Sequence, residues 1–121
     1  MGQSELVSSV KAYIAMHYME DSLNITSIAY HVRRNPKYLA RIFRAETGEK
    51  LLDYINKIRI QQAVVLLRTG MYSVKSVGEL VGYTTYRTFG RVFFQNMGTT
   101  PGRYLENEGY SKKMVQEIGT F

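Results

Sequence analysis

Apolar residues recur at intervals of three and four positions along most of this chain. Between Ser4 and Tyr18 they stand at Leu6, Val7, Val10, Tyr13, Ile14 and Tyr18. This spacing is typical of an amphipathic helix, because about 3.6 residues complete each turn. Comparable patterns predict further helices over residues 26–32, 35–48, 51–68, 74–81, 85–98 and 100–106. No alternation of period two persists, so the pattern predicts an all-α fold of about seven helices.

The segment from Asn35 to Gly48 combines helix-end signals with two opposed faces. Asn35 can accept hydrogen bonds from the free amides of a first turn, Pro36 suits the first helical position, and Gly48 can close the helix. At about 100° per residue, apolar side chains gather on one side and basic ones on the other. The apolar set is Leu39, Ile42 and Phe43, and the basic set is Lys37, Arg41 and Arg44. One face suits a core and the other suits an anionic partner.

The same pattern recurs, altered, fifty residues further along the chain, in residues 85–98. The apolar positions are repeated by Phe89, Val92 and Phe93, and two of the basic positions by Arg87 and Arg91. The short helix before each copy repeats too, with Ala29 and Gly78 at one matched position. Small residues there predict two helices that cross closely. A short helix, a tight turn and a helix with a basic outer face indicate a helix-turn-helix unit.

This duplication predicts two similar lobes of three helices each. We place an N-terminal helix and the first lobe in residues 1–50, a bridging helix in 51–69 and the second lobe in 70–106. Residues 107–121 carry only a weak apolar stripe, which predicts a flexible tail. A bridge of eighteen helical residues would be about 27 Å long. This length suits two recognition helices entering major-groove segments about 34 Å apart.

Charge strengthens the prediction of an anionic partner. The 121-residue chain has 16 Lys and Arg against 10 Asp and Glu, a net charge of +6, which favours a polyanion such as DNA. The chain has no cysteine and therefore no disulfide, which fits an intracellular protein. It shows neither a secretory leader nor an apolar run of about 18 residues. We therefore expect a soluble, cytoplasmic protein with no membrane partner.

Catalytic and metal-binding patterns are lacking. The two histidines, His17 and His31, stand apart from one another with no cysteine or tight carboxylate pattern beside them. No glycine-rich phosphate loop of the Walker type and no G-x-S-x-G turn is present in the sequence. We therefore expect no catalytic residue, no cofactor and no metal site, and we expect that the protein is not an enzyme.

A longer set of residues resembles a known family. It comprises Ile28, Ala29, Asn35, Pro36, Tyr38, Leu39, Arg41, Phe43, Thr47, Gly48, Tyr54, Arg59, Ala63, Leu66, Leu67, Val81, Gly82, Tyr83, Phe89, Arg91, Val92, Phe93, Gly98, Thr100, Pro101 and Tyr104. Over residues 6–106 the chain is similar to the DNA-binding domain of the AraC/XylS transcription regulators. Residues 32–39 are especially similar to response regulators of the YesN type, which carry this domain behind a phosphorylatable receiver.

The resemblance implies residue roles and partners. Residues facing the first groove segment would be Lys37, Ala40 and Arg41, with Arg44 near phosphate; residues facing the second would be Tyr86, Arg87, Gly90 and Arg91. The implied partners are double-stranded promoter DNA, RNA polymerase and a receiver or effector domain on the N-terminal side. Operator sequence, target genes and inducing signal do not follow from the residues.

Several polar residues admit a second interpretation. Candidate phosphate contacts are Arg33, Arg34, Asn35 and Thr85. The two arginines fit phosphate contact and simple solvation about equally well, and Asn35 is a helix cap first. We expect structural roles for Arg59 and core packing for Tyr38, Tyr54, Tyr83 and Tyr104, which sit in or beside apolar stripes.

The second basic helix departs from the family pattern. Gly90 replaces a small polar residue, and Phe94 and Gln95 replace basic ones, with Phe94 at the angular position of Arg44. We therefore expect the first basic helix to carry more of the affinity. An alternative function remains open at this point. The chain would then be a helix-turn-helix protein-interaction module with weak or no DNA binding, and Phe94, Val64 and Val65 would form its apolar patch.

Overall fold

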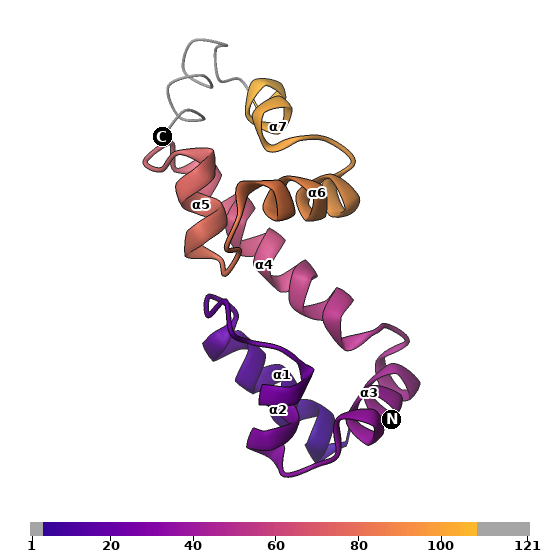
Figure 1. The fold of residues 1–121 in the computed structure, drawn as a ribbon. Coiled ribbons are helices and arrows are strands. Elements are labelled where there is room, and N and C mark those ends of the chain that lie inside the picture. Colours follow the sequence, from indigo (N-terminus) through magenta and orange to yellow (C-terminus); the bar gives the residue numbers. More distant parts are fainter. Residues whose placement is uncertain (1–3, 109–121) are drawn as a thin grey trace. The chain divides into compact units, whose positions relative to one another are not determined.

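The computed structural model describes residues 4–108, which form seven helices and no strand (Figure 1). The helices are α1 (Glu5–His17), α2 (Ile25–Val32), α3 (Pro36–Thr47), α4 (Leu51–Arg68), α5 (Val74–Leu80), α6 (Tyr86–Met97) and α7 (Pro101–Asn107). The predicted all-α fold is confirmed. None of these helices combines the length and hydropathy that crossing a lipid bilayer requires.

The predicted helix boundaries hold to within one or two residues. The structure begins α2 at Ile25, ends α5 at Leu80 and extends α7 to Asn107. These shifts have local causes, since Asn24 caps α2 through Ser27 and Val81 already leaves helical geometry. Except for Asn107 and Glu108, the predicted flexible tail lies outside the described residues.

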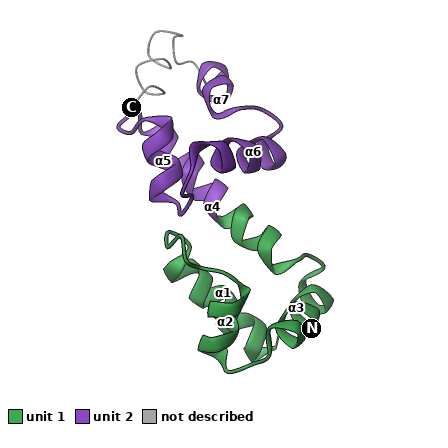
Figure 2. Ribbon diagram, viewed as in Figure 1, with its two compact units in different colours: residues 1–58 green, residues 59–121 purple. Residues whose placement is uncertain are grey.

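Two compact units divide the chain at Ile58 and Arg59 (Figure 2). The division falls inside α4, so this helix contributes its first half to one unit and its second half to the other. In the first unit, α1, α2 and α3 pack against one another. Their shared core consists of Val7, Val10, Ile14, Leu23, Ile28, Ala29, Leu39 and Phe43, completed by Leu51 and Ile55 of α4.

The second unit builds its core from the remaining half of α4 together with α5, α6 and α7. Its buried apolar residues are Ile60, Ala63, Leu67, Val74, Val77, Val81, Tyr83, Phe89, Val92, Phe93 and Leu105. Ring contacts run through it, since Phe89 meets Phe93 edge to face at 5.8 Å and Phe93 meets Tyr104 at 5.9 Å between ring centroids. Such pairs stabilise a core beyond their buried area.

The duplication seen in the sequence extends to individual hydrogen bonds. At the end of α2 the amide of Arg34 donates to the carbonyl of Ala29 at 2.9 Å, and at the end of α5 the amide of Tyr83 donates to Gly78 at 2.9 Å. Both bonds are the long closing bond of a Schellman turn. Both helix-turn-helix units therefore end their first helix with the same Schellman hydrogen bond.

Gly78 allows the close crossing that the sequence predicted. A Cβ atom built on this residue would lie 2.8 Å from Cδ2 and 2.9 Å from Cγ of the Phe89 ring. Real Cβ contacts are essentially never that short, so the ring occupies space that only glycine leaves. Gly78 thereby seats α6 against α5, and Ala29 of α2 stands at the matched position in the first unit.

Substituting two helical glycines by alanine separates this packing role from helix propensity. We expect Gly78→Ala to lower the free energy of unfolding by about 1–3 kcal/mol, since overpacking outweighs the propensity gain. Gly90→Ala should instead raise it by up to about 1 kcal/mol, because its Cβ would meet only Cε1 of Tyr86, at 3.9 Å. Urea unfolding of both variants checks this. Changes of the same sign would contradict the packing argument.

Candidate nucleic-acid interface

The outer face of α3 carries the predicted cations. Lys37, Arg41 and Arg44 are exposed, and Ala40 is half-buried between them. On the opposite side Leu39 and Phe43 are completely buried. Asn35 caps the helix as predicted, accepting hydrogen bonds from the amides of Lys37 at 2.8 Å and Tyr38 at 3.4 Å. The cap and the buried residues fix which face α3 turns outward.

Tyr38 lies at the surface, so the prediction that it packs in the core is wrong. Its side chain is 40% exposed, and the guanidinium carbon of Arg41 lies 5.5 Å from the centroid of its ring. Tyr38 and Arg41 are three positions apart on one helix, so their side chains are surface neighbours. The ring attracts the cation and orients Arg41, a role that the i, i+3 spacing could have suggested.

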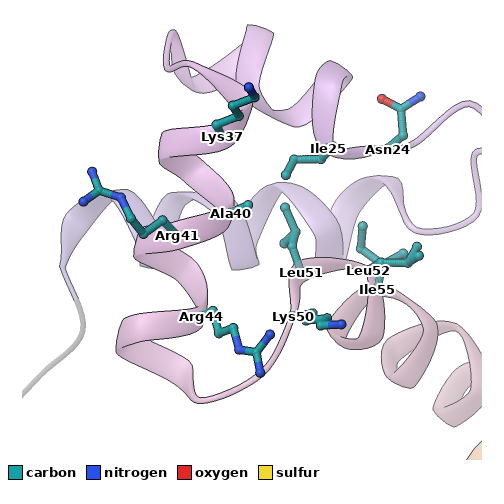
Figure 3. Close-up of a pocket in the computed structure, with 10 residues that line it drawn as sticks. All are labelled: Asn24, Ile25, Lys37, Ala40, Arg41, Arg44, Lys50, Leu51, Leu52 and Ile55. Carbon is teal, nitrogen blue, oxygen red and sulfur yellow. The ribbon is translucent and has the colours of Figure 1, made fainter.

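A hollow of about 670 Å³ lies beside this face. Its lining comes from three elements: Asn24 and Ile25 at the start of α2, Lys37, Ala40, Arg41 and Arg44 of α3, and Lys50, Leu51, Leu52 and Ile55 around the start of α4. In Figure 3 the side chains of Ile25 and Leu51 turn toward each other beside Ala40. The hollow therefore has an apolar centre and a basic border.

The outer face of α6 has fewer cations. Tyr86, Arg87 and Arg91 are exposed, and Gly90 is half-buried. Thr85 caps the helix by accepting a hydrogen bond from the amide of Thr88 at 3.1 Å. Phe94 occupies the position that Arg44 holds in α3 and is 54% exposed, so it is a surface residue as its angular position predicted.

The cations of both faces have no acidic partner in the part of the chain that the structure describes. Its ion pairs include His17 with Glu20, Lys57 with Glu49 at 2.8 Å and Arg68 with Glu108 at 3.1 Å. Within residues 4–108, none involves Lys37, Arg41, Arg44, Arg87 or Arg91. These side chains are thus available to an external anion.

Arg33 has an unusual backbone in the turn between α2 and α3. Its φ is 57°, and it is the single non-glycine residue with positive φ among those described. The matched turn of the second unit has Gly82 at this position, with φ of 108°. A left-handed conformation costs a side-chain-bearing residue about 1–2 kcal/mol. Beside it, a guanidinium nitrogen of Arg34 donates to the carbonyl of Arg33 at 3.2 Å.

Arg59 and Tyr83 are structural, as expected. Arg59 is only 6% exposed, and its guanidinium carbon lies 5.3 Å from the centroid of the buried Tyr83 ring. Burial raises the pKa of Tyr83 to about 12, although the charges of Arg59 and Arg91 act against this rise. Tyr54 and Tyr104 are half-buried, and desolvation raises the pKa of each. All three hydroxyls remain protonated at neutral pH.

No group of three His, Asp or Glu side chains suited to a metal ion occurs among residues 4–108. Eight of the predicted site residues lie on the outer faces of α3 and α6, one face in each unit, and the other four lie in the turn before α3 or at the caps of these two helices. Each face belongs to the second helix of a helix-turn-helix unit. Such a helix suits the DNA major groove.

Known proteins resemble this chain in sequence and in fold. Residues 28–107 match the model of a helix-turn-helix domain family. The arabinose operon regulatory protein of Escherichia coli is 34% identical over 92 residues, which cover 76% of this chain and 32% of that protein. The C-terminal domain of AraT, a response regulator from Geobacillus stearothermophilus, has a TM-score of 0.87 and 28% identity, with 93% of both chains covered. The DNA-binding domain of AdpA, solved in complex with a target DNA, has a TM-score of 0.78 and 26% identity, covering 86% of this chain and 93% of that one.

The fold and the two basic faces thus define a DNA-binding domain of the helix-turn-helix class. Within that class the chain belongs to the AraC family of transcription regulators, which confirms the resemblance seen in the sequence. Its structural relatives include response-regulator domains such as that of AraT. The chain spans about a third of the length of the arabinose operon regulatory protein.

The stacking of Arg41 on Tyr38 predicts a measurable effect on DNA affinity. Tyr38→Leu should weaken binding about two- to fivefold, because an exposed cation–π contact contributes about 0.5–1 kcal/mol. Tyr38→Phe keeps the ring and should bind as the native chain does. Fluorescence anisotropy with a duplex selected from random DNA measures both. Equal losses in the two variants would instead assign the effect to the hydroxyl group.

Proposed function

We propose that this chain binds double-stranded promoter DNA sequence-specifically by inserting α3 and α6 into successive major-groove segments. The observation that carries the proposal is the pair of matched outward faces. Arg87 and Arg91 of α6 repeat Lys37 and Arg41 of α3, and the described part of the chain offers these cations no acidic partner. A charged side chain held outward and unpaired suits phosphates and guanine edges.

Each proposed contact has a role that its chemistry suits. Lys37 and Arg41 read base edges in the first segment, and Ala40 lets the backbone of α3 approach the bases. Arg44 meets phosphate. In the second segment the contacts are Tyr86, Arg87, Gly90 and Arg91. Phosphates flanking the two segments are bound by Arg33, Arg34, Asn35 and Thr85, of which Asn35 and Thr85 also cap their helices.

The two lobes are proposed to occupy residues 1–50 and 70–106, with residues 51–69 as the bridge between them. The eighteen residues of α4 make a helix about 27 Å long. That length is of the same order as the roughly 34 Å between successive major-groove segments on one side of B-DNA. A bridge of this size therefore suits the proposed double insertion.

Further partners follow from the family rather than from the chain itself. The chain spans about a third of the arabinose operon regulatory protein, and AraT is a response regulator. We propose that a receiver or effector domain controls this domain from its N-terminal side and that the bound protein contacts RNA polymerase. The domain works in the cytoplasm as a binding module and catalyses no reaction.

Salt titration of DNA binding tests the proposal. Using a duplex selected from random DNA, we expect log affinity to fall linearly with log salt. Arg41→Ala and Arg91→Ala should each cost about 1–3 kcal/mol on that duplex. Arg103→Ala removes an exposed arginine from α7 and serves as the matched control, with no such loss expected.

Indifference to salt and to both substitutions would refute DNA recognition by these faces. That result would favour the alternative of a protein-interaction module. Phe94 and Val65 then become the residues to test, because each exposes more than half of its side chain.

Arg33 offers a second test, because stability and binding should change in opposite directions. Arg33→Gly relieves the left-handed strain, so the free energy of unfolding should rise by up to about 1 kcal/mol after the extra flexibility of glycine is deducted. Loss of one phosphate contact should weaken binding to all duplexes alike. It should also reduce the magnitude of the salt slope, which is the slope of log affinity against log salt concentration, by about one. Urea unfolding and anisotropy measure the two effects. A stability gain with unchanged binding would show that Arg33 is merely solvated.

A further inference from the structure

One strip on the outer face of α6 is apolar. Tyr86, Phe94 and Met97 expose 49%, 54% and 38% of their side chains. At about 100° per residue, these three and Gly90 fall within about 80° of the helix circumference. Arg87 and Arg91 border the strip. In α3 the position matched to Phe94 holds Arg44, so an aromatic ring has replaced a cation on the proposed DNA-binding face.

Gly90 lies in the middle of this strip. A Cβ atom there would have a single neighbour within 4 Å, Cε1 of Tyr86 at 3.9 Å. Internal packing therefore does not require glycine, whose helix propensity is worse than that of alanine by about 1 kcal/mol. The absent side chain leaves the backbone of α6 uncovered between Tyr86 and Phe94, which lets another molecule approach closely.

The rings of Tyr86 and Phe94 flank this opening. Tyr86 meets the buried ring of Phe89 edge to face, with 6.4 Å between centroids and 74° between planes. Its ring is thus oriented by the core. Phe94 is more exposed. Leaving such a ring in water forgoes the free energy of apolar burial, so an apolar group on a partner would be favoured there.

The major groove presents one apolar group of this kind, the C5 methyl of thymine. We infer that α6 recognises thymine through this methyl group, with Phe94 as the principal contact and Tyr86 beside it. The inference rests on the proposed insertion of α6 into the groove. Asn96, whose amide could read adenine, instead donates to the carbonyl of Val92 at 2.9 Å. The half-site of α6 is therefore read by apolar contact together with Arg87 and Arg91.

Replacing thymine by deoxyuridine tests this directly, because uracil lacks only the C5 methyl and still pairs with adenine. The full chain is titrated with its selected duplex and with duplexes carrying deoxyuridine at one thymine at a time. Removing one buried methyl group should weaken binding about fourfold at the contacted thymine. The Phe94→Ala variant should bind the thymine duplex at least about fourfold more weakly than the native chain does. This variant should bind the thymine duplex and the deoxyuridine duplex with equal affinity.

Two control variants test whether the preference for the thymine methyl group depends on Phe94 itself. Leu80→Ala removes an apolar side chain of similar exposure from α5 of the same unit and should keep the preference for thymine. Phe94→Arg restores the cation found at the matched position of α3. That variant should lose the preference for thymine and gain a salt slope steeper by about one.

The inference is overturned if the native chain binds the thymine duplex and every deoxyuridine duplex with the same affinity. It is also overturned if the Phe94→Ala variant keeps every preference for thymine that the native chain shows. Either result leaves the proposed function intact as long as binding still depends on salt and on Arg41. If no duplex binds in that salt-dependent way, the proposed function itself fails. The two failures are therefore distinguishable in one set of titrations.

Discussion

The close contact between Gly78 and the ring of Phe89 determines how the second unit presents its outer face. A Cβ atom on Gly78 would lie 2.8 Å from Cδ2 of this ring, so a side chain at Gly78 would displace Phe89 and with it α6. Close-packed interiors resist small volume changes of this kind. The apolar period of α6 decides which of its residues are outward, and the missing side chain at Gly78 lets its buried side lie close against α5. In the first unit the matched position is held by Ala29 of α2, a small residue that is also buried.

Duplicated turns preserve the scaffold while the outer faces diverge. The closing hydrogen bonds at Arg34 and Tyr83 join equivalent atoms over the same distance, and both following helices end in a glycine of positive φ. The backbone thus closes both turns with the same hydrogen-bond pattern. The two units differ in chemistry at several matched positions: Arg44 is matched by Phe94, and Arg33 by Gly82. Each unit serves as an internal reference for the other.

Helix positions and helix faces followed from the sequence because both are local properties. The cap at Asn35, the glycine after α3 and the 3.6-residue apolar period act within one or two turns. The exposure of Tyr38 did not follow, because a residue beside an apolar stripe is covered only if a neighbouring helix reaches it. The left-handed backbone of Arg33 could not be predicted from the residue itself, because arginine does not indicate a positive φ. The matched residue Gly82 is what indicates a positive φ at this position of the turn. The hollow beside α3 depends on three segments meeting and has no signature in any one of them.

The contrast between Arg44 and Phe94 makes the two faces sensitive to different surroundings. Attraction between exposed charges and phosphates is screened as ionic strength rises, whereas burial of an aromatic ring is barely affected by dilute salt. Apolar burial instead carries a negative heat-capacity change, so its strength varies with temperature. Under the proposed double insertion, the affinity contributed by Arg44 would depend mainly on ionic strength, whereas the affinity contributed by Phe94 would depend mainly on temperature.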